Sequence, residues 1–418
     1  MIMSGWKNFY KLTSDERITK LAENRQLTVA DQKLMRDHFD AVGSQQVENY
    51  LYNFGVPVGV ITDLLINDHH VTVPMATEEP SVIAAANNGA KLVRYGTGIK
   101  TRQTERLVRG QVIVTGLDNP DDLLKYVNEH VADLLNLANN AYPSMKKRGG
   151  GAKRILSEVI DHDKVIVNIL VDPQAAMGAN VVNTMAEAVA QQLRTIGYNV
   201  LLAILSNMAT EAIIDAQVKI PVGVLATKGG LTGAEVADRI VQASLIEQLS
   251  EYRAVTSNKG LMNGIEAAVL ASGNDTRSVN AALHAYAAKD GKYRGLVQWS
   301  IDDGELVGKT TLPLLLGVVG GSIGIVPAVK LNHTIMGNPD VNELTAIIAG
   351  VGLVQNLAAL KALVTTGIQS GHMKLQAKSL AVAVGASPSE VPLVVRALQA
   401  EKKFNSSSAK RILDEIRK

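Results

Sequence analysis

The segments QVIVTGL (111–117), KVIVNILVD (164–172) and NVLLAILS (199–206) are short apolar runs that are typical of buried strands. Two stretches of helical composition lie between them, DNPDDLLKYVNEHVADLLNLANNAY (118–142) and AMGANVVNTMAEAVAQQLRTIG (176–197). Strands and helices therefore alternate through one continuous part of the chain. This alternation predicts a self-contained α/β module near the middle of the sequence.

The regions on both sides of the module indicate a larger unit that mixes helices with extended segments. On the N-terminal side, Ser14 and Thr28 are expected to cap two short helices, residues 48–75 look extended, and Pro80 is expected in the first turn of an alanine-rich helix. Inside the module, KKRGGGAKR (146–154) is interpreted as a basic loop. Because the 418-residue chain exceeds the usual size of a single core, two or three domains are expected.

The composition excludes several classes of protein. Lys and Arg total 42 against 40 acidic residues. The net charge of +2 therefore predicts no broad basic surface that would bind nucleic acid. The absence of cysteine excludes disulfides and thiolate chemistry, so a redox function would need a diffusible cofactor. The uncharged run Thr311–Val329 contains Pro313, Pro327 and four glycines, which suit buried strands better than a membrane helix. We therefore expect a cytoplasmic protein without a membrane partner.

No standard nucleotide-binding fingerprint is present. The sequence contains neither G-x-G-x-x-G between a strand and a helix nor G-x-x-x-x-G-K-[ST]. The segment Ala176–Asn180, AMGAN, is the nearest substitute, because its small residues open a helix after a strand and would let a pyrophosphate approach backbone N–H groups. Close packing of the helix is the more ordinary explanation for the same residues.

Three charged residues are candidates for chemistry. Glu79 precedes an expected helix start, where it could act as a proton donor or simply as a capping acid. Lys259 and Asn263 are spaced i, i+4 at another expected helix start and could direct donors at one developing oxyanion, although a solvated lysine fits the same pattern. Asp275 follows Ser272-Gly273-Asn274, and a helix that fills the interval between Lys259 and these residues would be roughly 18 Å long. These two side chains can therefore meet only if the chain doubles back or another subunit supplies one of them.

The histidines indicate no metal site. His69-His70 and Asp161-His162-Asp163 lack a complementary cluster at zinc-ligand spacing, so solvated turns explain both groups better and no metal is expected. His372 stands alone near an expected helix start, and by itself it would be structural or exposed.

Four blocks of sequence are informative in combination and order. They are PMATEEPSVIAAANNGAKL (74–92), AAMGANVVNTMAEAV (175–189), YRAVTSNKGLMNGIEAAVLASGNDTR (252–277) and VQNLAALKALVTTGIQSGHMKLQAKSLA (354–381). Together they resemble the bacterial, class II 3-hydroxy-3-methylglutaryl-CoA (HMG-CoA) reductases, and the match runs from about residue 48 to residue 385.

The resemblance implies an α+β fold in three parts. A large mixed helical and sheet domain for binding the CoA substrate and for dimerisation would comprise residues 1–104 and 209–368. A small non-Rossmann, ferredoxin-like α/β domain for the NAD(P) cofactor would be inserted at 105–208, in agreement with the missing fingerprint. Residues 369–418 would form a C-terminal helical flap. The active site would lie at the interface of a homodimer, alone or within a dimer of dimers.

The resemblance also implies a reaction. HMG-CoA would be reduced to mevalonate and CoA by two NAD(P)H, in two successive hydride transfers via mevaldehyde, within the mevalonate pathway of isoprenoid biosynthesis. Glu79, Lys259, Asp275 and His372 match the catalytic positions of the family. Lys259 would stabilise the negative carbonyl oxygen, and Glu79, with its pKa held up by a nearby Asp275, would protonate the aldehyde oxygen. His372 would protonate the departing CoA thiolate.

Further residues would bind substrate and cofactor by the same correspondence. Ser81, Arg253 and Asn263 would contact the hydroxymethylglutaryl group, with Arg253 on its free carboxylate. The dinucleotide site would contain Met177, Gly178, Ala179, Asn180 and Asn207. The basic loop with Lys146 and Arg148 lacks an acid for a ribose 2′-hydroxyl, so it favours the 2′-phosphate of NADPH over NADH. A solvated basic turn is the alternative interpretation of that loop.

Departures from the family's pattern leave other functions open. Ala175 stands where the family usually has Asp, Ser257 where it has His, and Gly320–Gly324 reads GGSIG where Gly-Gly-Ala-Thr-Lys is common. These changes would suit a catalytically weakened paralogue that binds acyl-CoA or dinucleotide without turnover. A scaffold dimer, in which the glycine-rich segments only pack, is a third possibility.

Overall fold

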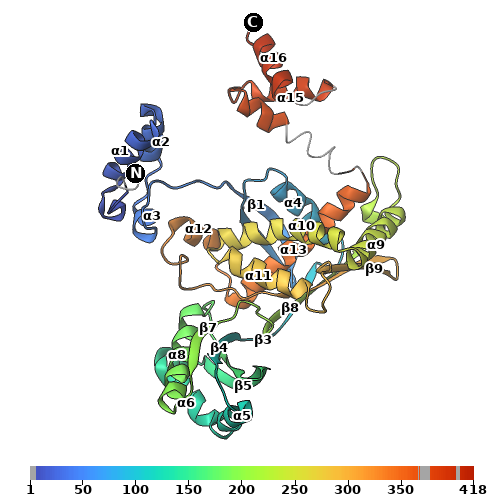
Figure 1. Cartoon of the computed structure of the whole chain (residues 1–418). Helices are drawn as coiled ribbons and strands as arrows, with labels where there is room; N and C mark the ends of the chain where they lie inside the picture. Colours follow the sequence, from blue (N-terminus) through green and yellow to red (C-terminus); the bar gives the residue numbers. More distant parts are fainter. Residues whose placement is uncertain (1–5, 366, 368–376, 402–404) are drawn as a thin grey trace.

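The structure is a computed structural model that describes residues 6–365, 367, 377–401 and 405–418. This part of the chain mixes helices with two β-sheets (Figure 1). Most of its buried apolar side chains belong to three clusters. The first cluster belongs to the larger sheet and its helices, and the third to the C-terminal helices. The second belongs mainly to the smaller sheet and extends to a few residues of the larger unit, such as Ala212 and Ala282. The expectation of a mixed helix and sheet fold is confirmed.

Helix α13 (Val341–Val364) lies at the centre of the largest apolar cluster. It begins with a capping box in which the side chain of Asp340 accepts from the backbone of Glu343 and the Glu343 side chain accepts in return. The helices that pack on α13 are α4 (Val82–Val93), α9 (Gly233–Leu249) and α10 (Glu251–Ala271). Gly89 of α4 permits this close approach, because a Cβ there would lie 2.1 Å from the carbonyl oxygen of Val354.

Helix α13 is also long and apolar enough to cross a membrane. Its mean hydropathy is 1.8, but 72% of that window is buried inside the protein, as in the core helix of a globular unit. The run Thr311–Val329, which the sequence offered as the membrane-like segment, forms no such helix. It contains the end of a strand, an irregular glycine-rich stretch and the start of α12 (Pro327–Ile335).

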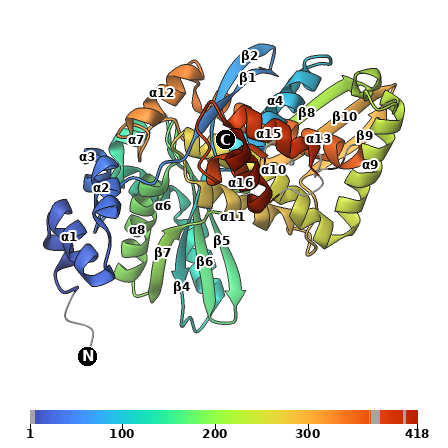
Figure 2. The same ribbon diagram turned by 90° about the horizontal axis from the view of Figure 1, so that it is seen from above.

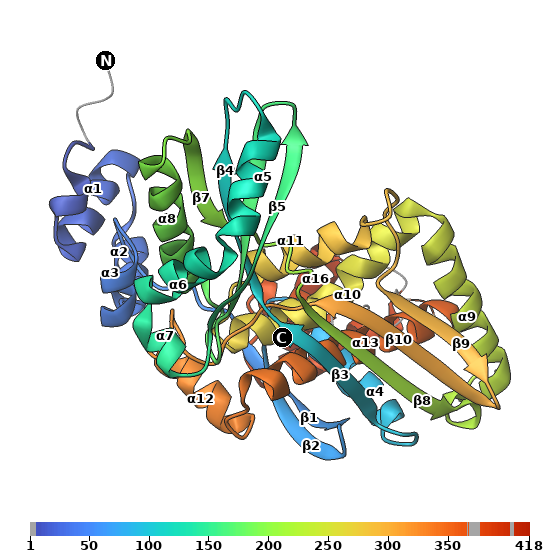
Figure 3. The same cartoon turned by 90° about the horizontal axis from the view of Figure 1, so that it is seen from below.

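The larger sheet has six strands in the order β2-β1-β3-β8-β10-β9. The strands are β1 (Val58–Ile66), β2 (His69–Ala76), β3 (Ile99–Arg106), β8 (Ala212–Pro221), β9 (Val297–Asp302) and β10 (Glu305–Pro313). Neighbouring strands are antiparallel except β1 and β3. In β8 every second residue is buried, so one face packs on helices while the other is open. Figure 3 shows β3, β8 and β10 in front of α10 and α13.

The smaller sheet has four strands in the order β5-β6-β4-β7, all antiparallel to their neighbours. Its strands are β4 (Val108–Val114), β5 (Gly151–Asp161), β6 (Lys164–Asp172) and β7 (Val200–Leu205), and its helices are α5 (Pro120–Glu129), α6 (Val131–Ala141), α7 (Pro143–Lys147) and α8 (Ala179–Thr195). Helices α6 and α8 contact each other and cover the sheet (Figure 2). The chain order is therefore β-α-β-β-α-β.

Some local predictions were wrong. The expected helix at 118–142 divides at His130, whose backbone leaves the helical region. Residues 146–154, which were expected to form a loop, instead contain the end of α7 and the start of β5. The sequence did not predict this strand, because most of its residues are exposed and many of those are charged. At the N-terminal helices, Thr28 is a cap as expected, but Thr13 rather than Ser14 caps the preceding helix.

The remaining elements lie at the ends of the chain and around the larger sheet. They are η1 (Phe9–Lys11), α1 (Ser14–Arg25), α2 (Val29–Asp37), α3 (Ala41–Gln46), η2 (Val222–Leu225), α11 (Thr276–Ala287), α15 (Val391–Ala400) and α16 (Ser406–Ile416). Helices α15 and α16 pack with the helical residues 377–383 in a cluster that includes Leu398 and Leu413. Figure 1 shows α1–α3 and α15–α16 standing apart from the body of the molecule.

Candidate active site

Glu79 and Lys259 form an ion pair across 180 residues of sequence. Glu79 lies between β2 and α4, and Lys259 lies in the third turn of α10. The Lys259 Nζ donates to Glu79 Oε2 at 3.2 Å. The sequence suggested that Lys259 stands at a helix start, and this was wrong because α10 already begins at Glu251. Lys259 and its neighbours give no obvious helical signal in the sequence. They are nevertheless helical because α10 packs on α13.

Two further donors surround the Glu79 carboxylate. The Ser81 Oγ donates to Glu79 Oε1 at 3.2 Å, and Asn263 Nδ2 lies 3.5 Å from Glu79 Oε2. Ser81 is the N-cap of α4, so Pro80 precedes the helix rather than sitting in its first turn. The side chains of Glu79 and Lys259 are 31% and 65% exposed, and a Cβ added at Gly260 would meet open space. A substrate can therefore reach the ammonium and the carboxylate together.

Asp275 is held elsewhere in the chain, at the N-terminus of α11. It accepts from the backbone N–H groups of Arg277 at 2.9 Å and Ser278 at 3.2 Å, and from the Arg277 guanidinium at 3.2 Å. Burial alone would raise the pKa of Asp275, but these hydrogen bonds outweigh it and leave the pKa below its usual value. Among the described residues, no hydrogen bond or ion pair joins Asp275 to Glu79 or Lys259.

Asp275 lines a cavity of about 570 Å³ beside the N-terminus of α8. The lining consists of Tyr142, residues 176–181, residues 273–275, Arg277 and residues 319–323. Met177, Gly178, Ala179 and Asn180 are all in this set. Gly178, the N-cap of α8, has a φ of 107°, and a Cβ there would lie 2.6 Å from the Cβ of Pro173. Glycine is therefore required, and backbone N–H groups of the first turn are left without a side-chain cap.

Arg106 holds the loop that precedes α8, a role that sequence reasoning missed. Its guanidinium donates to the carbonyl oxygens of Gln174 and Ala176, both at 2.7 Å, and also to that of Leu316. Burial lowers the pKa of Arg106 to about 10, although the charge of Asp172 opposes this shift. An arginine at the end of an exposed strand carries no local signal, because its partners are backbone groups far along the chain.

The glycine-rich segment 317–324 is held in place by hydrogen bonds from backbone and side-chain groups. The backbone N–H of Val318 donates to Ala175 O at 2.8 Å, and Asn274 exchanges two hydrogen bonds with the backbone of Gly317. The Ser322 Oγ donates to Gly273 O at 2.9 Å. The hydrogen bond of Ala175 uses its backbone oxygen, so it does not depend on the side chain at this position. Ser322, which departs from the family's pattern, has a defined hydrogen-bond partner in Gly273.

The other candidate residues lie around these two places. Asn207 accepts from Ser278 Oγ at 2.8 Å, next to Asp275. Lys146 and Arg148 are exposed at the end of α7, outside the cavity lining, although Tyr142 just before them is part of it. Arg253 lies six residues before Lys259, about 9 Å along α10. His372 lies outside the described residues.

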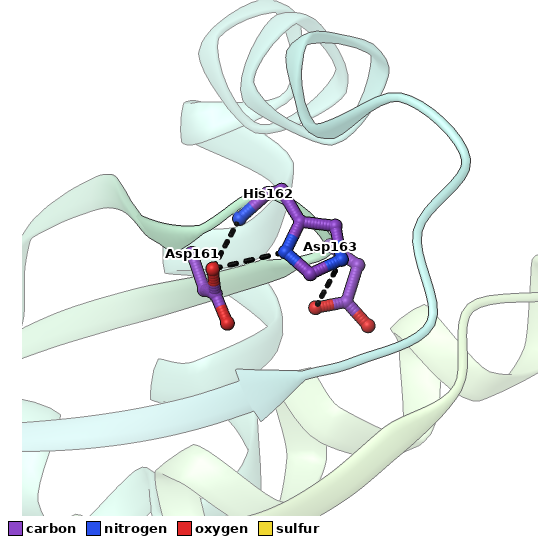
Figure 4. A group of neighbouring side chains, drawn as sticks. All are labelled: Asp161, His162 and Asp163. Carbon is purple, nitrogen blue, oxygen red and sulfur yellow. Dashed lines mark hydrogen bonds and ion pairs between the residues drawn. The ribbon is translucent and has the colours of Figure 1, made fainter.

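The one group of possible metal ligands found in the described chain is Asp161-His162-Asp163, at the turn between β5 and β6 (Figure 4). Its ligand atoms lie within 4.8 Å of one another. However, Lys164 Nζ already donates to Asp161 at 2.8 Å and to Asp163 at 2.6 Å, and these hydrogen bonds raise the pKa of Lys164. The cluster is thus an exposed hairpin turn in which one ammonium already pairs with both carboxylates and balances one of their two negative charges.

Comparison with known proteins assigns the chain to one family. The family model for hydroxymethylglutaryl-coenzyme A reductase matches residues 13–377. A 3-hydroxy-3-methylglutaryl-coenzyme A reductase of Archaeoglobus fulgidus is 39% identical, over 98% of this chain and 94% of its own. A probable reductase of Borreliella burgdorferi is 34% identical, over 91% and 89% of the two chains.

Solved structures agree. The reductase of Streptococcus pneumoniae has a TM-score of 0.77 and 43% identity, covering 99% of this chain and all of its own. A second structure, of the class II enzyme of that organism bound to NADPH in open conformations, has a TM-score of 0.76 and 42% identity, covering 97% of this chain. The chain therefore belongs to the hydroxymethylglutaryl-coenzyme A reductase family.

Proposed function

We propose that this protein reduces HMG-CoA to mevalonate and CoA with two NAD(P)H, in the mevalonate pathway. The observation that carries the proposal is the ion pair of Lys259 and Glu79, with Asn263 beside it, in a chain that belongs to this family. An exposed ammonium next to a carboxyl group is the arrangement that reduction of a thioester requires. One group stabilises a developing oxyanion, and the other donates a proton to it.

Lys259 directs its ammonium at the carbonyl oxygen as that atom gains negative charge, and the Asn263 amide provides a second donor on the same helix face. Glu79, in its protonated form, then supplies the proton to the oxygen of mevaldehyde and is left as the carboxylate that pairs with Lys259. The 3.2 Å contact between Lys259 and Glu79 keeps the two groups at one position, so the same oxygen can be stabilised and protonated without moving the substrate.

Three other residues complete the proposed substrate site. Ser81, already hydrogen-bonded to Glu79, contacts the hydroxymethylglutaryl group. Arg253 binds the free carboxylate of that group, since a guanidinium offers two parallel donors. His372 of the C-terminal segment protonates the CoA thiolate as it leaves, which prevents its return to the aldehyde.

The cavity beside α8 is the proposed cofactor site, with NADPH preferred. Its residues fit a dinucleotide, because Gly178 lets a ligand approach the uncapped N–H groups at the start of a 17-residue helix. The bound nicotinamide supplies the hydride in each reduction. Met177, Ala179, Asn180 and Asn207 surround the dinucleotide. Lys146 and Arg148, exposed and without a nearby acid in their loop, attract the 2′-phosphate of NADPH.

The division into domains is also part of this proposal. Residues 1–104 and 209–368 form the substrate-binding and dimerisation domain, 105–208 the inserted cofactor domain, and 369–418 the flap. Three apolar clusters centred on these regions support this division, although the cluster of the cofactor domain also includes Ala209, Ala212, Ala282 and Leu315 of the substrate domain. The β-α-β-β-α-β order with an all-antiparallel sheet supports a ferredoxin-like cofactor domain. A Rossmann domain would instead have a parallel sheet.

We propose a homodimer, alone or within a dimer of dimers, in which Asp275 of one subunit approaches Glu79 and Lys259 of the other. Within one chain, the described hydrogen bonds of Asp275 are with Arg277 and Ser278 and not with Glu79 or Lys259, which supports this arrangement. Mixing Lys259→Ala and Asp275→Asn proteins tests it, because each mixed dimer would contain one site with both native groups. We expect activity to recover to about a quarter of the wild-type value. Recovery no greater than the sum of the two variants would contradict a shared site.

The function itself is tested by following nicotinamide absorbance with purified protein and HMG-CoA, with NADPH and NADH in parallel and mevalonate identified as product. We expect two NADPH consumed per mevalonate and a higher kcat/KM with NADPH. A protein that binds both ligands without turnover would instead be the weakened paralogue, an alternative that the comparisons do not support. A scaffold dimer would bind neither. We further propose a cytoplasmic location.

A further inference from the structure

Two buried polar side chains of α12, Asn332 and His333, have no part in the proposed chemistry. They are 6% and 8% exposed, and both are directed at the C-terminal end of α10. Asn332 Nδ2 donates to the carbonyl oxygen of Ala271 at 2.8 Å, and His333 Nε2 lies 2.9 Å from the carbonyl oxygen of Ser272. A carbonyl oxygen can only accept, so the Nε2 atom of His333 carries a hydrogen and donates it.

The way α10 ends explains why these two carbonyl oxygens need donors. Gly273, with a φ of 74°, and Asn274 donate their backbone N–H groups to carbonyl oxygens of the preceding turn, each at 3.0 Å. This Schellman arrangement leaves the carbonyl groups of Ala271 and Ser272 to partners outside α10. Ala271 is 3% exposed and Ser272 is fully buried, so solvent does not replace such partners. The two side chains of α12 therefore complete the end of α10.

The turn at 272–274 is also joined to the glycine-rich segment 317–324. Asn274 exchanges hydrogen bonds of 2.8 and 3.0 Å with the backbone of Gly317, and Ser322 Oγ donates to a carbonyl oxygen of the turn at 2.9 Å. Three residues of the segment line both the cavity beside α8 and a second cavity of about 510 Å³. Open space thus borders much of the segment, and the turn is one of its main supports.

Asp275 follows this turn directly. Its carboxylate accepts from the backbone N–H groups of Arg277 and Ser278, so it is fixed relative to the start of α11. The place where α11 begins is set in turn by the end of α10. A shift of the turn would therefore move Asp275 and the glycine-rich lining of the cavity together.

We propose that His333 and Asn332 are positioning residues, which hold the turn that places both Asp275 and the glycine-rich lining of the cavity. This inference rests on the proposed function, in which Asp275 acts beside Glu79 and Lys259 of the partner subunit and the cavity binds NADPH. Neither α12 residue lines that cavity. Both act through the backbone, because a displacement of about 1 Å is enough to slow a reaction that depends on aligned groups.

Two substitutions of His333 give the main test. Leucine fills a similar volume but cannot donate, whereas the side-chain amide of glutamine can donate in place of Nε2. For His333→Leu we expect kcat at saturating NADPH to fall about tenfold, and the dissociation constant of NADPH to rise about threefold to tenfold, at unchanged KM for HMG-CoA. His333→Gln should recover most of both losses. Mevalonate formation measures the kinetic constants, and fluorescence titration without substrate measures NADPH binding.

A combination with Asp275→Asn shows whether His333 acts through Asp275. In the Asp275→Asn protein, His333→Leu should lower kcat no further, because the carboxylate that it displaces is already absent. A purely structural role would instead lower kcat by the same factor in both backgrounds. Melting temperatures of all variants show how much stability each has lost.

Two further variants of α12 complete the design. Asn332→Ala removes the second donor and should give the same pattern with smaller losses, so it tests the inference if His333→Leu does not fold. Thr334→Ala changes an exposed neighbour on the same helix, and it should match the wild type in kcat and in affinity for NADPH.

The outcomes separate the inference from the function on which it rests. A wild-type protein that forms no mevalonate would overturn the proposed function and the effect on turnover, while NADPH titration of His333→Leu would still decide the effect on the cavity. An active enzyme in which His333→Leu changes neither kcat nor NADPH affinity would overturn the inference alone. Equal losses of kcat with and without the Asp275 carboxylate, or a His333→Gln protein no better than His333→Leu, would do the same.

Discussion

The cluster at Glu79 and the cavity beside α8 are built in opposite ways. The first consists of four polar side chains from remote elements, joined by direct contacts such as the 3.2 Å ion pair of Glu79 and Lys259. The second is lined by backbone and small residues such as Gly178, and the partly buried Arg106 holds the adjacent loop by hydrogen bonds to its carbonyl oxygens. The cluster should therefore be sensitive to the loss of a charge. The cavity should be sensitive to added atoms and to movement of its loops.

The largest effect is expected from Lys259→Ala. We expect kcat to fall by about 10³-fold or more, since the main donor to the oxyanion is removed, while the melting temperature changes little because the side chain is 65% exposed. Turnover of NADPH and thermal unfolding by circular dichroism measure the two quantities. Lys125→Ala, at an exposed lysine of α5, is the control. A variant that loses stability along with activity would break the contrast between the two regions.

Gly178→Ala tests the cavity. The φ of 107° and the 2.6 Å approach to Pro173 should cost about 1–3 kcal/mol of stability and weaken NADPH binding by about tenfold or more. Gly197→Ala is a matched control at the other end of α8, because its φ is 103° but no atom lies within 4 Å of the added Cβ. It should lose stability through strain alone and keep its affinity for NADPH. Equal affinities in the two variants would show that the close approach at Gly178 does not shape the site.

Arg106→Lys sharpens the comparison by loosening the cavity without adding atoms. A lysine cannot reach the carbonyl oxygens of Gln174, Ala176 and Leu316 together, so we expect a loss of about 1–2 kcal/mol and severalfold weaker NADPH binding at unchanged KM for HMG-CoA. Calorimetric melting and fluorescence titration measure these effects. Arg102→Lys, on the same strand but 82% exposed, should be neutral. A rise in the KM for HMG-CoA would mean that the two sites are not separable.

The smallest effect is expected from Lys146→Ala combined with Arg148→Ala. Both side chains are exposed, so their attraction for a 2′-phosphate is screened by solvent. We expect kcat/KM for NADPH to fall only about twofold and that for NADH to change little. Parallel falls with both cofactors would show that these cations hold the loop rather than choose the cofactor.

The sequence was sufficient for the features that depend on local order. Apolar periodicity located β4, β6, α8 and β7, because burial imposes a repeat that can be read along the chain. The combination of four blocks identified the family before any coordinates. Glu79, Ser81, Lys259 and Asn263, which were singled out in those blocks, do lie together in the fold.

Only the tertiary structure decided which distant groups meet. It placed Lys259 in the middle of a helix and revealed β5, since packing and strand pairing outweigh local propensity at both positions. It also brought Arg106 to backbone carbonyls up to 210 residues away and enclosed Glu247 without a full set of partners. Hydrogen bonds to backbone and the loss of solvent around a charge leave no periodic pattern in the chain, so neither could be inferred from residue order alone.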